Sequence, residues 1–102
     1  MMKIEEELLK DVHALLHPIR FRIVELLAEK PMYINEIRNA LGEERQLVSY
    51  HLLSLEEYGF LSSNYEISGQ GKLKGKVIKK YYVTGKVEAV ILELKKRLST
   101  LD

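Results

Sequence analysis

The segment Glu44–Tyr58, with the sequence ERQLVSYHLLSLEEY, decides how the rest of the chain can fold. Val48, Leu52 and Leu55 recur at spacings of four and three residues, so a helix gathers them into one apolar stripe for a core. The side chains that would project away from this stripe are those of Gln46, Ser49, Tyr50 and Ser54. Gly59 follows directly and favours a left-handed cap that ends the helix, with Phe60 placed to pack back on Leu55.

A second short amphipathic segment, Asn35–Leu41, comes before this helix. It stops at Gly42, so only a tight turn separates it from Glu44. Two short helices joined in this way are typical of the helix-turn-helix motif, whose second helix lies in a DNA groove.

Four pieces of the sequence, in order, resemble the arsenical-resistance-repressor (ArsR-type) winged helix-turn-helix family. The pieces are Leu16–Arg20 (LHPIR), Ile34–Ile37 (INEI) with Leu41–Gly42, Val48–Leu52 (VSYHL) and Leu55–Leu61 (LEEYGFL). The resemblance covers residues 15–84. It implies a mostly α fold with a small β-hairpin (α+β), in the order helix, helix, short strand, helix, helix, strand, strand, helix. It also implies a single domain over residues 1–102.

The function that the resemblance implies is sequence-specific transcriptional regulation, with repression the expected role. The partners would be double-stranded DNA and a second copy of the chain. A homodimer would place two copies of helix 44–58 about one DNA turn apart, on an imperfect palindrome.

The two ends of the chain carry broad apolar faces. Ile4–Leu16 predicts a first helix, and Thr84–Gly85 predicts the cap of a last one. In the resembling family these helices form the subunit interface, so residues 1–16 and 85–102 are expected to be dimerisation helices. The alternative is that each packs only on its own domain. The interface candidates are Leu8, Val12, Val90, Ile91, Leu94 and Leu98.

Charge is distributed unevenly along the chain, although the net charge is only +1. Residues 1–60 have a net charge of −4 and residues 61–102 a net charge of +5, and Ser68–Lys86 holds six lysines and no acid. Alternation over Leu61–Ile67 predicts a strand with one buried face, and Lys76–Thr84 is its expected hairpin partner. The Gly- and Lys-rich tip between them is predicted to be a wing. Lys72, Lys74 and Lys76 are expected to contact the DNA backbone, the alternative being a merely solvated loop.

The exposed face of helix 44–58 supplies the candidates for contact with bases. Gln46 can bond adenine in a bidentate manner, and Ser49 and Tyr50 share its face. Arg45 and Tyr50 can equally hold phosphates. His51 lies at the border of the apolar stripe, where it is either a half-buried histidine or a phosphate donor.

One departure from the family pattern favours a second function. Glu43 and Glu44 stand at the helix start, where the family has a small hydroxyl residue. Carboxylates suit the positive end of a helix dipole but repel the DNA backbone. The alternative is therefore a winged-helix protein-interaction module that no longer binds DNA.

No metal or cofactor site is expected. The chain has no cysteine, which excludes disulfides and thiolate ligands. His13 and His17 are four residues apart, but no third ligand completes a site. Metal-sensing members of the family have cysteines where Tyr33 and Asn35 stand here, and the last helix, Val87–Leu98, has no histidine.

Composition points to an ordinary globular chain, with 46% hydrophobic and 30% charged residues. No apolar run reaches membrane length and the N-terminus is too acidic for a secretory signal, so a cytoplasmic location without membrane partners is expected. No nucleophile, base and acid combination is recognisable, so no enzymatic activity is expected.

Overall fold

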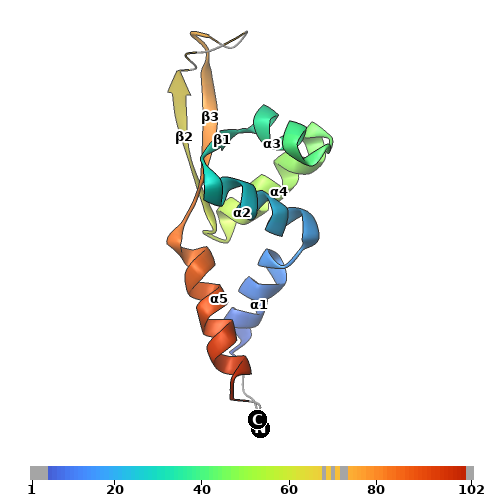
Figure 1. Ribbon diagram of the computed structural model, residues 1–102, viewed down its shortest axis with the longest axis vertical. Coiled ribbons are helices and arrows are strands. Elements are labelled where there is room, and N and C mark those ends of the chain that lie inside the picture. The colour runs from blue at the N-terminus through green and yellow to red at the C-terminus, as the bar shows by residue number, and fades with distance from the viewer. Residues whose placement is uncertain (1–4, 68, 70, 72–73, 101–102) are drawn as a thin grey trace.

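The computed structural model describes residues 5–67, 69, 71 and 74–100. Its helices and strands follow one another in the predicted order (Figure 1). They are α1 (Glu6–Leu15), α2 (Pro18–Glu29), β1 (Met32–Tyr33), α3 (Ile34–Leu41), α4 (Arg45–Glu57), β2 (Leu61–Ile67), β3 (Val77–Val83) and α5 (Gly85–Leu98). The predicted fold class, α+β with a winged helix-turn-helix order, is confirmed. Of the predicted first helix, Ile4 lies outside the described residues.

The strands form one antiparallel sheet in the order β1-β3-β2. In the hairpin Leu61 pairs with Val83 and Ile67 with Val77, and β1 joins the other edge of β3 through Met32 and Tyr81. Figure 1 shows an elongated molecule with the hairpin at one end, α1 and α5 at the other, and α2, α3 and α4 between them. The outer half of the hairpin therefore projects from the helical body, whereas its inner half packs against α2 and α4.

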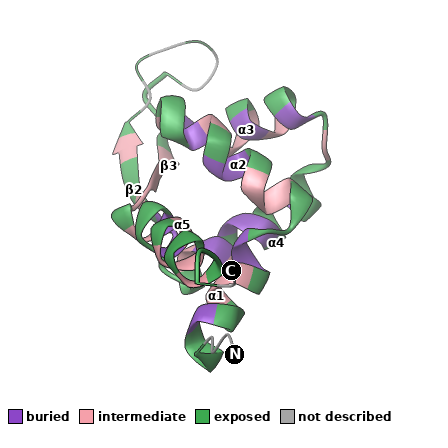
Figure 2. Ribbon diagram, turned by 60° about the horizontal axis from the view of Figure 1, so that its bottom comes forward, coloured by how far each residue is buried: buried purple, intermediate pink, exposed green. Residues whose placement is uncertain are grey.

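The core lies where α2, α3 and α4 face one another, and Figure 2 shows their buried residues on these inner sides. The predicted stripe of Val48, Leu52 and Leu55 is confirmed, because none of the three is exposed. Ile23 from α2 and Ile37 from α3 are equally buried. Burial of these aliphatic side chains fixes the angle at which α4 leaves the core, because packed interiors leave few alternative positions.

Local sequence signals set the ends of the helices. Past α4, Gly59 has a φ of 81°, its N–H donates to the Glu56 carbonyl at 2.9 Å, and the Phe60 N–H donates to the Leu55 carbonyl at 2.9 Å. This is the Schellman arrangement, so the predicted stop at Gly59 is confirmed. At the start of α5 the Thr84 hydroxyl accepts from the Lys86 N–H at 3.3 Å, as its capping role predicts.

The prediction that β2 has one continuous buried face is wrong. Leu61 is buried, but Tyr65 and Ile67 on the same face are 73% and 71% exposed. The physical reason is that the outer half of the hairpin extends past the helical body, so its apolar side chains meet no core within the described part of the chain. In this outer half, the pairing of β2 with β3 keeps the strand extended, and burial of its side chains does not contribute.

Candidate nucleic-acid interface

The turn between α3 and α4 is short and tightly defined. Gly42 adopts a left-handed conformation with φ 69° and ψ 28°, and its N–H donates to the Arg38 carbonyl at 2.8 Å. Glu44 then takes the N-cap position of α4 with extended backbone and makes no side-chain capping bond. Among common residues glycine adopts this left-handed conformation without steric cost, and so the turn directs α4 away from α3 at a set angle.

The predicted DNA-contact residues at the start and in the middle of helix 44–58, other than His51, lie on the exposed side of α4. Arg45, Gln46, Ser49 and Tyr50 are all exposed, and Tyr50 presents 59% of its surface. Gln46 and Tyr50 are one turn apart, so they project from the same face of the helix. Leu53, three residues further on, continues that outward row with 58% of its surface exposed.

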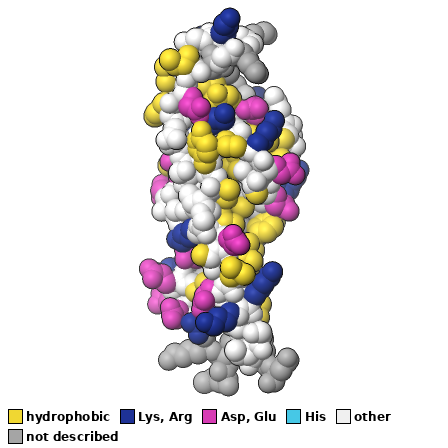
Figure 3. Space-filling model, turned by 60° about the vertical axis from the view of Figure 1, so that its left-hand side comes forward, with side chains coloured by type: hydrophobic (Ala, Val, Ile, Leu, Met, Phe, Trp, Pro, Cys, Tyr) yellow, Lys and Arg dark blue, Asp and Glu magenta, His cyan; other side chains and the backbone are white. Residues whose placement is uncertain are grey.

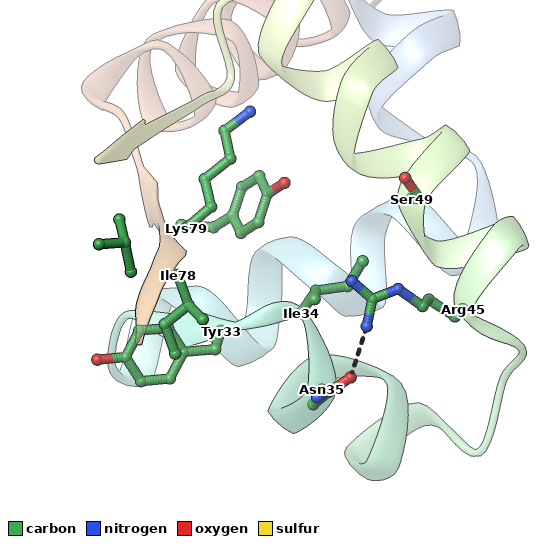
Figure 4. Close-up of a pocket in the computed structure, with 9 residues that line it drawn as sticks. Tyr33, Ile34, Asn35, Arg45, Ser49, Ile78 and Lys79 are labelled. Atoms are coloured by element: carbon green, nitrogen blue, oxygen red, sulfur yellow. Dashed lines mark hydrogen bonds between the residues drawn. The ribbon is translucent and has the colours of Figure 1, made fainter. Parts of the chain in front are cut away.

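Arg45 also links the two helices of the motif. Its Nη1 donates to Asn35 Oδ1 at 3.0 Å, across the turn from the first turn of α3 (Figure 4). The bonded partner is a neutral amide, which does not offset the positive charge of the guanidinium at the N-terminal end of α4. A cation held there is available to an anion approaching from solvent.

His51 is placed differently from its prediction as a DNA contact. The side chain is only 4% exposed, and its Nδ1 accepts a hydrogen bond from Arg20 Nε at 2.9 Å. Its ring also lies 4.5 Å from that of His17 and 5.1 Å from that of Tyr50, centroid to centroid. The structure thus supports the buried-histidine alternative, because the ring is enclosed between α2 and α4. Arg20, on α2, is the donor that satisfies it.

Burial also determines the protonation state of this histidine. Desolvation is the main cause that lowers the pKa of His51 below its ordinary value of 6.5, and the neighbouring His17 and Arg20 side chains lower it further. A neutral ring with a bare Nδ1 is what the bond from Arg20 requires. His51 therefore positions α4 against α2 through a neutral imidazole.

The lysines of the hairpin and of the start of α5 differ in their surroundings. Lys79 and Lys86 are ion-paired, with Glu56 at 3.4 Å and with Asp11 at 3.1 Å. Lys74 and Lys76, by contrast, are exposed at the projecting end of the hairpin. Figure 3 shows basic and apolar side chains together at this end of the molecule. Lys72, the third predicted wing contact, lies outside the described residues.

A cleft separates α4 from the hairpin, and sequence reasoning did not foresee it. Its volume is about 360 Å³. Figure 4 shows Arg45 and Ser49 on α4 opposite Ile78 and Lys79 on β3, with Ile34 between them. The other lining residues are Tyr33, Asn35, Val77 and Tyr81. These positions come from β1, α3, α4 and β3, and only the tertiary packing of these four elements brings them together.

The helical end of the molecule requires a correction to the predicted interface. Leu8 and Val90 are buried inside the chain itself, because α1 and α5 pack against each other. Val12, Ile91 and Leu94 are half-buried, and Leu98 is 45% exposed. The larger exposed apolar side chains of these two helices and their ends are those of Leu9, Leu16, Leu92 and Leu98.

Two further expectations concern metals and membranes. Within residues 5–67, 69, 71 and 74–100 no group of three or more His, Asp or Glu side chains is arranged to hold a metal ion. No helix in the same ranges has the length and apolar character needed to cross a bilayer.

Comparison with known proteins agrees with the geometry. A family model described as a helix-turn-helix domain matches residues 15–64, which include α2, α3 and α4. A search of curated protein sequences finds no match.

Several solved structures share the fold. The reduced form of the transcriptional regulator YodB from B. subtilis superposes with a TM-score of 0.72 at 16% identity, covering 92% of this chain and 90% of that one. A homodimeric winged helix-turn-helix DNA-binding domain from Mycobacterium bovis, a possible ArsR-family regulator, gives 0.64 at 19% identity, covering 92% and 79%. The transcriptional repressor BigR from Xylella fastidiosa gives 0.61 at 22% identity, covering 94% and 85%. The chain therefore has a winged helix-turn-helix fold, as predicted, and it shares this fold with these transcriptional regulators.

Proposed function

We propose that this chain is a DNA-binding transcriptional regulator that represses as a homodimer on an imperfect palindrome. The observation that carries the proposal is the uncovered outward row of α4, with Gln46 and Tyr50 exposed beside a projecting hairpin. A helix with this exposed polar face fits the major groove, where base edges differ in their donors and acceptors. In this arrangement Gln46 contacts adenine, Ser49 and Tyr50 flank it, and Arg45 holds a phosphate.

The hairpin would act as the wing. Lys74 and Lys76 would follow the DNA backbone, and Lys72 belongs to the same stretch of sequence. Phosphate contacts contribute affinity without sequence preference, and they release counterions, so binding falls as salt rises.

Dimerisation is proposed through α1 and α5. The M. bovis domain with this fold is homodimeric. Exposed leucines of the two helices, Leu9 and Leu92 among them, supply apolar surface that a second copy would cover. Leu92→Asp should shift the chain from dimer to monomer in analytical ultracentrifugation. Leu53→Asp, at a similarly exposed leucine on α4, should leave the oligomeric state unchanged.

Salt-dependent DNA binding is the direct test. Gel shifts are carried out with DNA selected from random sequence. The logarithm of the association constant should fall linearly with the logarithm of the salt concentration. Lys74→Ala with Lys76→Ala should reduce that slope by about 0.9 for each phosphate that is no longer neutralised. Lys95→Ala with Lys96→Ala removes the same charge from the far end of α5 and should leave the slope nearly unchanged. Binding that ignores salt, or equal effects of the two pairs, would refute the proposed wing.

Base preference tests α4 separately. Gln46→Ala should reduce discrimination at one base pair by about tenfold, because a bidentate pair contributes about 1–3 kcal/mol. The variant should keep most of its non-specific affinity. If Gln46→Ala selects the same DNA sequence as the unmodified chain, Gln46 does not make the proposed base contact.

The alternative function, a protein-interaction module, is favoured by the acids at the start of α4. Glu44 is exposed and its side chain makes no capping bond. The two functions differ in the salt titration: Glu44→Gln should strengthen binding if α4 lies on DNA, because it removes a repulsive charge. If neither the unmodified chain nor Glu44→Gln forms a DNA complex at low salt, the protein-interaction alternative is supported.

A further inference from the structure

The cleft between α4 and the hairpin has two chemically different walls. Arg45 and Ser49, with Asn35 beside them, present a guanidinium, a hydroxyl and an amide. Ile34 and Ile78 provide aliphatic surface (Figure 4). Pockets for small organic molecules have this composition, an apolar lining with a few convergent polar groups, and volumes of about 300–1,000 Å³.

The charged groups favour an anion at the α4 side. Arg45 bonds only the neutral Asn35 oxygen among the hydrogen bonds of the described residues, and no ion pair there includes it. Lys79, the other cation of the cleft, is already paired with Glu56 at 3.4 Å. Glu56 would repel an anion at that side. The acids Glu43 and Glu44 line a separate hollow. A carboxylate is therefore directed to Arg45, where the N-terminal end of α4 adds a favourable dipole.

The rest of the cleft suits an aromatic ring. Tyr33 and Tyr81 add aromatic surface to that of Ile34 and Ile78. Burial raises the pKa of the Tyr81 hydroxyl, so the group stays protonated and offers a donor instead of a negative charge. A volume of about 360 Å³ accommodates a molecule with one ring.

We propose that this cleft binds a small aromatic monocarboxylate, its carboxylate on Arg45 and Ser49 and its ring between Ile34 and Ile78. Such a ligand would act as an effector. It occupies two side chains that the proposed function assigns to DNA, so ligand and DNA would exclude each other. This second part rests on the proposed function, whereas binding of the ligand to the free protein does not.

The first experiment uses the full chain without DNA. Benzoate is titrated while amide resonances are followed by NMR, and saturable shifts are expected at Ser49 and Ile78. Benzamide lacks the charge and acetate lacks the ring, so each should bind at least about tenfold more weakly. Shifts that do not saturate, or acetate and inorganic phosphate binding as tightly as benzoate, would overturn the site, since the apolar wall would then have no role.

Variants locate the ligand. Arg45→Gln should weaken benzoate at least about tenfold, because it removes a charge-assisted bond at an exposed position. Ile78→Ala should weaken it severalfold, because the ring then has less apolar surface to pack on. Ile67→Ala is the matched control on the same hairpin, since Ile67 is exposed and does not line the cleft. Equal affinities of Arg45→Gln and the unmodified chain would overturn the proposal even if Ile78→Ala fails to fold.

Competition completes the test. Benzoate should release labelled DNA at concentrations that saturate the free protein, and benzamide should not. DNA binding without benzoate binding would refute this inference and leave the proposed function standing. Benzoate binding without any DNA complex would refute the proposed function and leave the ligand site standing. Simultaneous binding of both would overturn the effector role.

Discussion

Gly42→Ala should destabilise the chain through backbone strain alone. Gly42 joins α3 to α4 with φ at 69°, a left-handed conformation. A Cβ built on Gly42 meets no atom within 4 Å, so the substitution introduces no clash with other residues. The position therefore isolates the conformational cost of an L-residue from any packing effect.

The expected magnitude follows from two opposing contributions. Holding an L-residue in the left-handed region costs about 1–2 kcal/mol. Alanine also reduces the conformational entropy of the unfolded chain, which stabilises the folded state by about 0.4–1 kcal/mol. The free energy of unfolding should therefore fall by about 1 kcal/mol, equivalent to about 4–8 °C in Tm for a domain of this size. Gly42→Asn should be less destabilising, because asparagine tolerates this conformation better.

Gly85→Ala is the matched control. Gly85 also has open space around its Cβ position, but its φ lies outside the left-handed range and it begins α5. Alanine there should raise stability by about 0.5 kcal/mol. Urea unfolding at one fixed protein concentration measures all three variants, since a dimer's stability depends on concentration. The predicted backbone strain at Gly42 would be refuted if alanine had the same effect on the free energy of unfolding at both glycines. It would also be refuted if Gly42→Ala were as stable as the unmodified chain.

Three further predictions concern the core, a titratable group and a helix cap. Leu52→Ala should lower the unfolding free energy by about 2–5 kcal/mol and Leu53→Ala by less than about 0.5, because the first side chain is 0% and the second 58% exposed; urea denaturation compares them directly. The pKa of His51 is lowered in the folded state, so below pH 6.5 the unfolded state binds more protons than the folded state. The free energy of unfolding should therefore have its full His51 contribution above pH 6.5 and decline as the pH falls below this value. His51→Gln should flatten this decline in thermal melts from about pH 5 to 8, and an equal slope in both proteins would contradict the assignment. Thr84→Ala should cost about 1 kcal/mol and Thr84→Ser much less, since the hydroxyl caps α5 and also donates to the Gly59 carbonyl at 2.6 Å; identical melting of the two variants would exclude a role for the hydroxyl.

Local sequence signals were sufficient for the helices of the helix-turn-helix motif and for where they end, and the family resemblance predicted the order of all the elements. The spacing of Val48, Leu52 and Leu55 identified α4, and Gly42 and Gly59 marked where helices stop. These signals depend on contacts within about one turn, or on the backbone freedom of a single residue, so they are visible in the chain itself.

Only the tertiary structure decided which surfaces remain available. His51 could face solvent or the core, and Arg20, distant in sequence, enclosed it. Leu8 and Val90 have the apolar pattern of an interface, yet α1 and α5 cover each other at these positions. Tyr65 alternates as if buried but projects beyond the body. In each case the repeat of the helix or strand determines the direction in which a side chain points. Whether that side chain is buried depends on which distant part of the chain packs against it. The cleft beside Arg45 is the clearest example, because the packing of β1, α3, α4 and β3 forms it from residues that share no local sequence pattern.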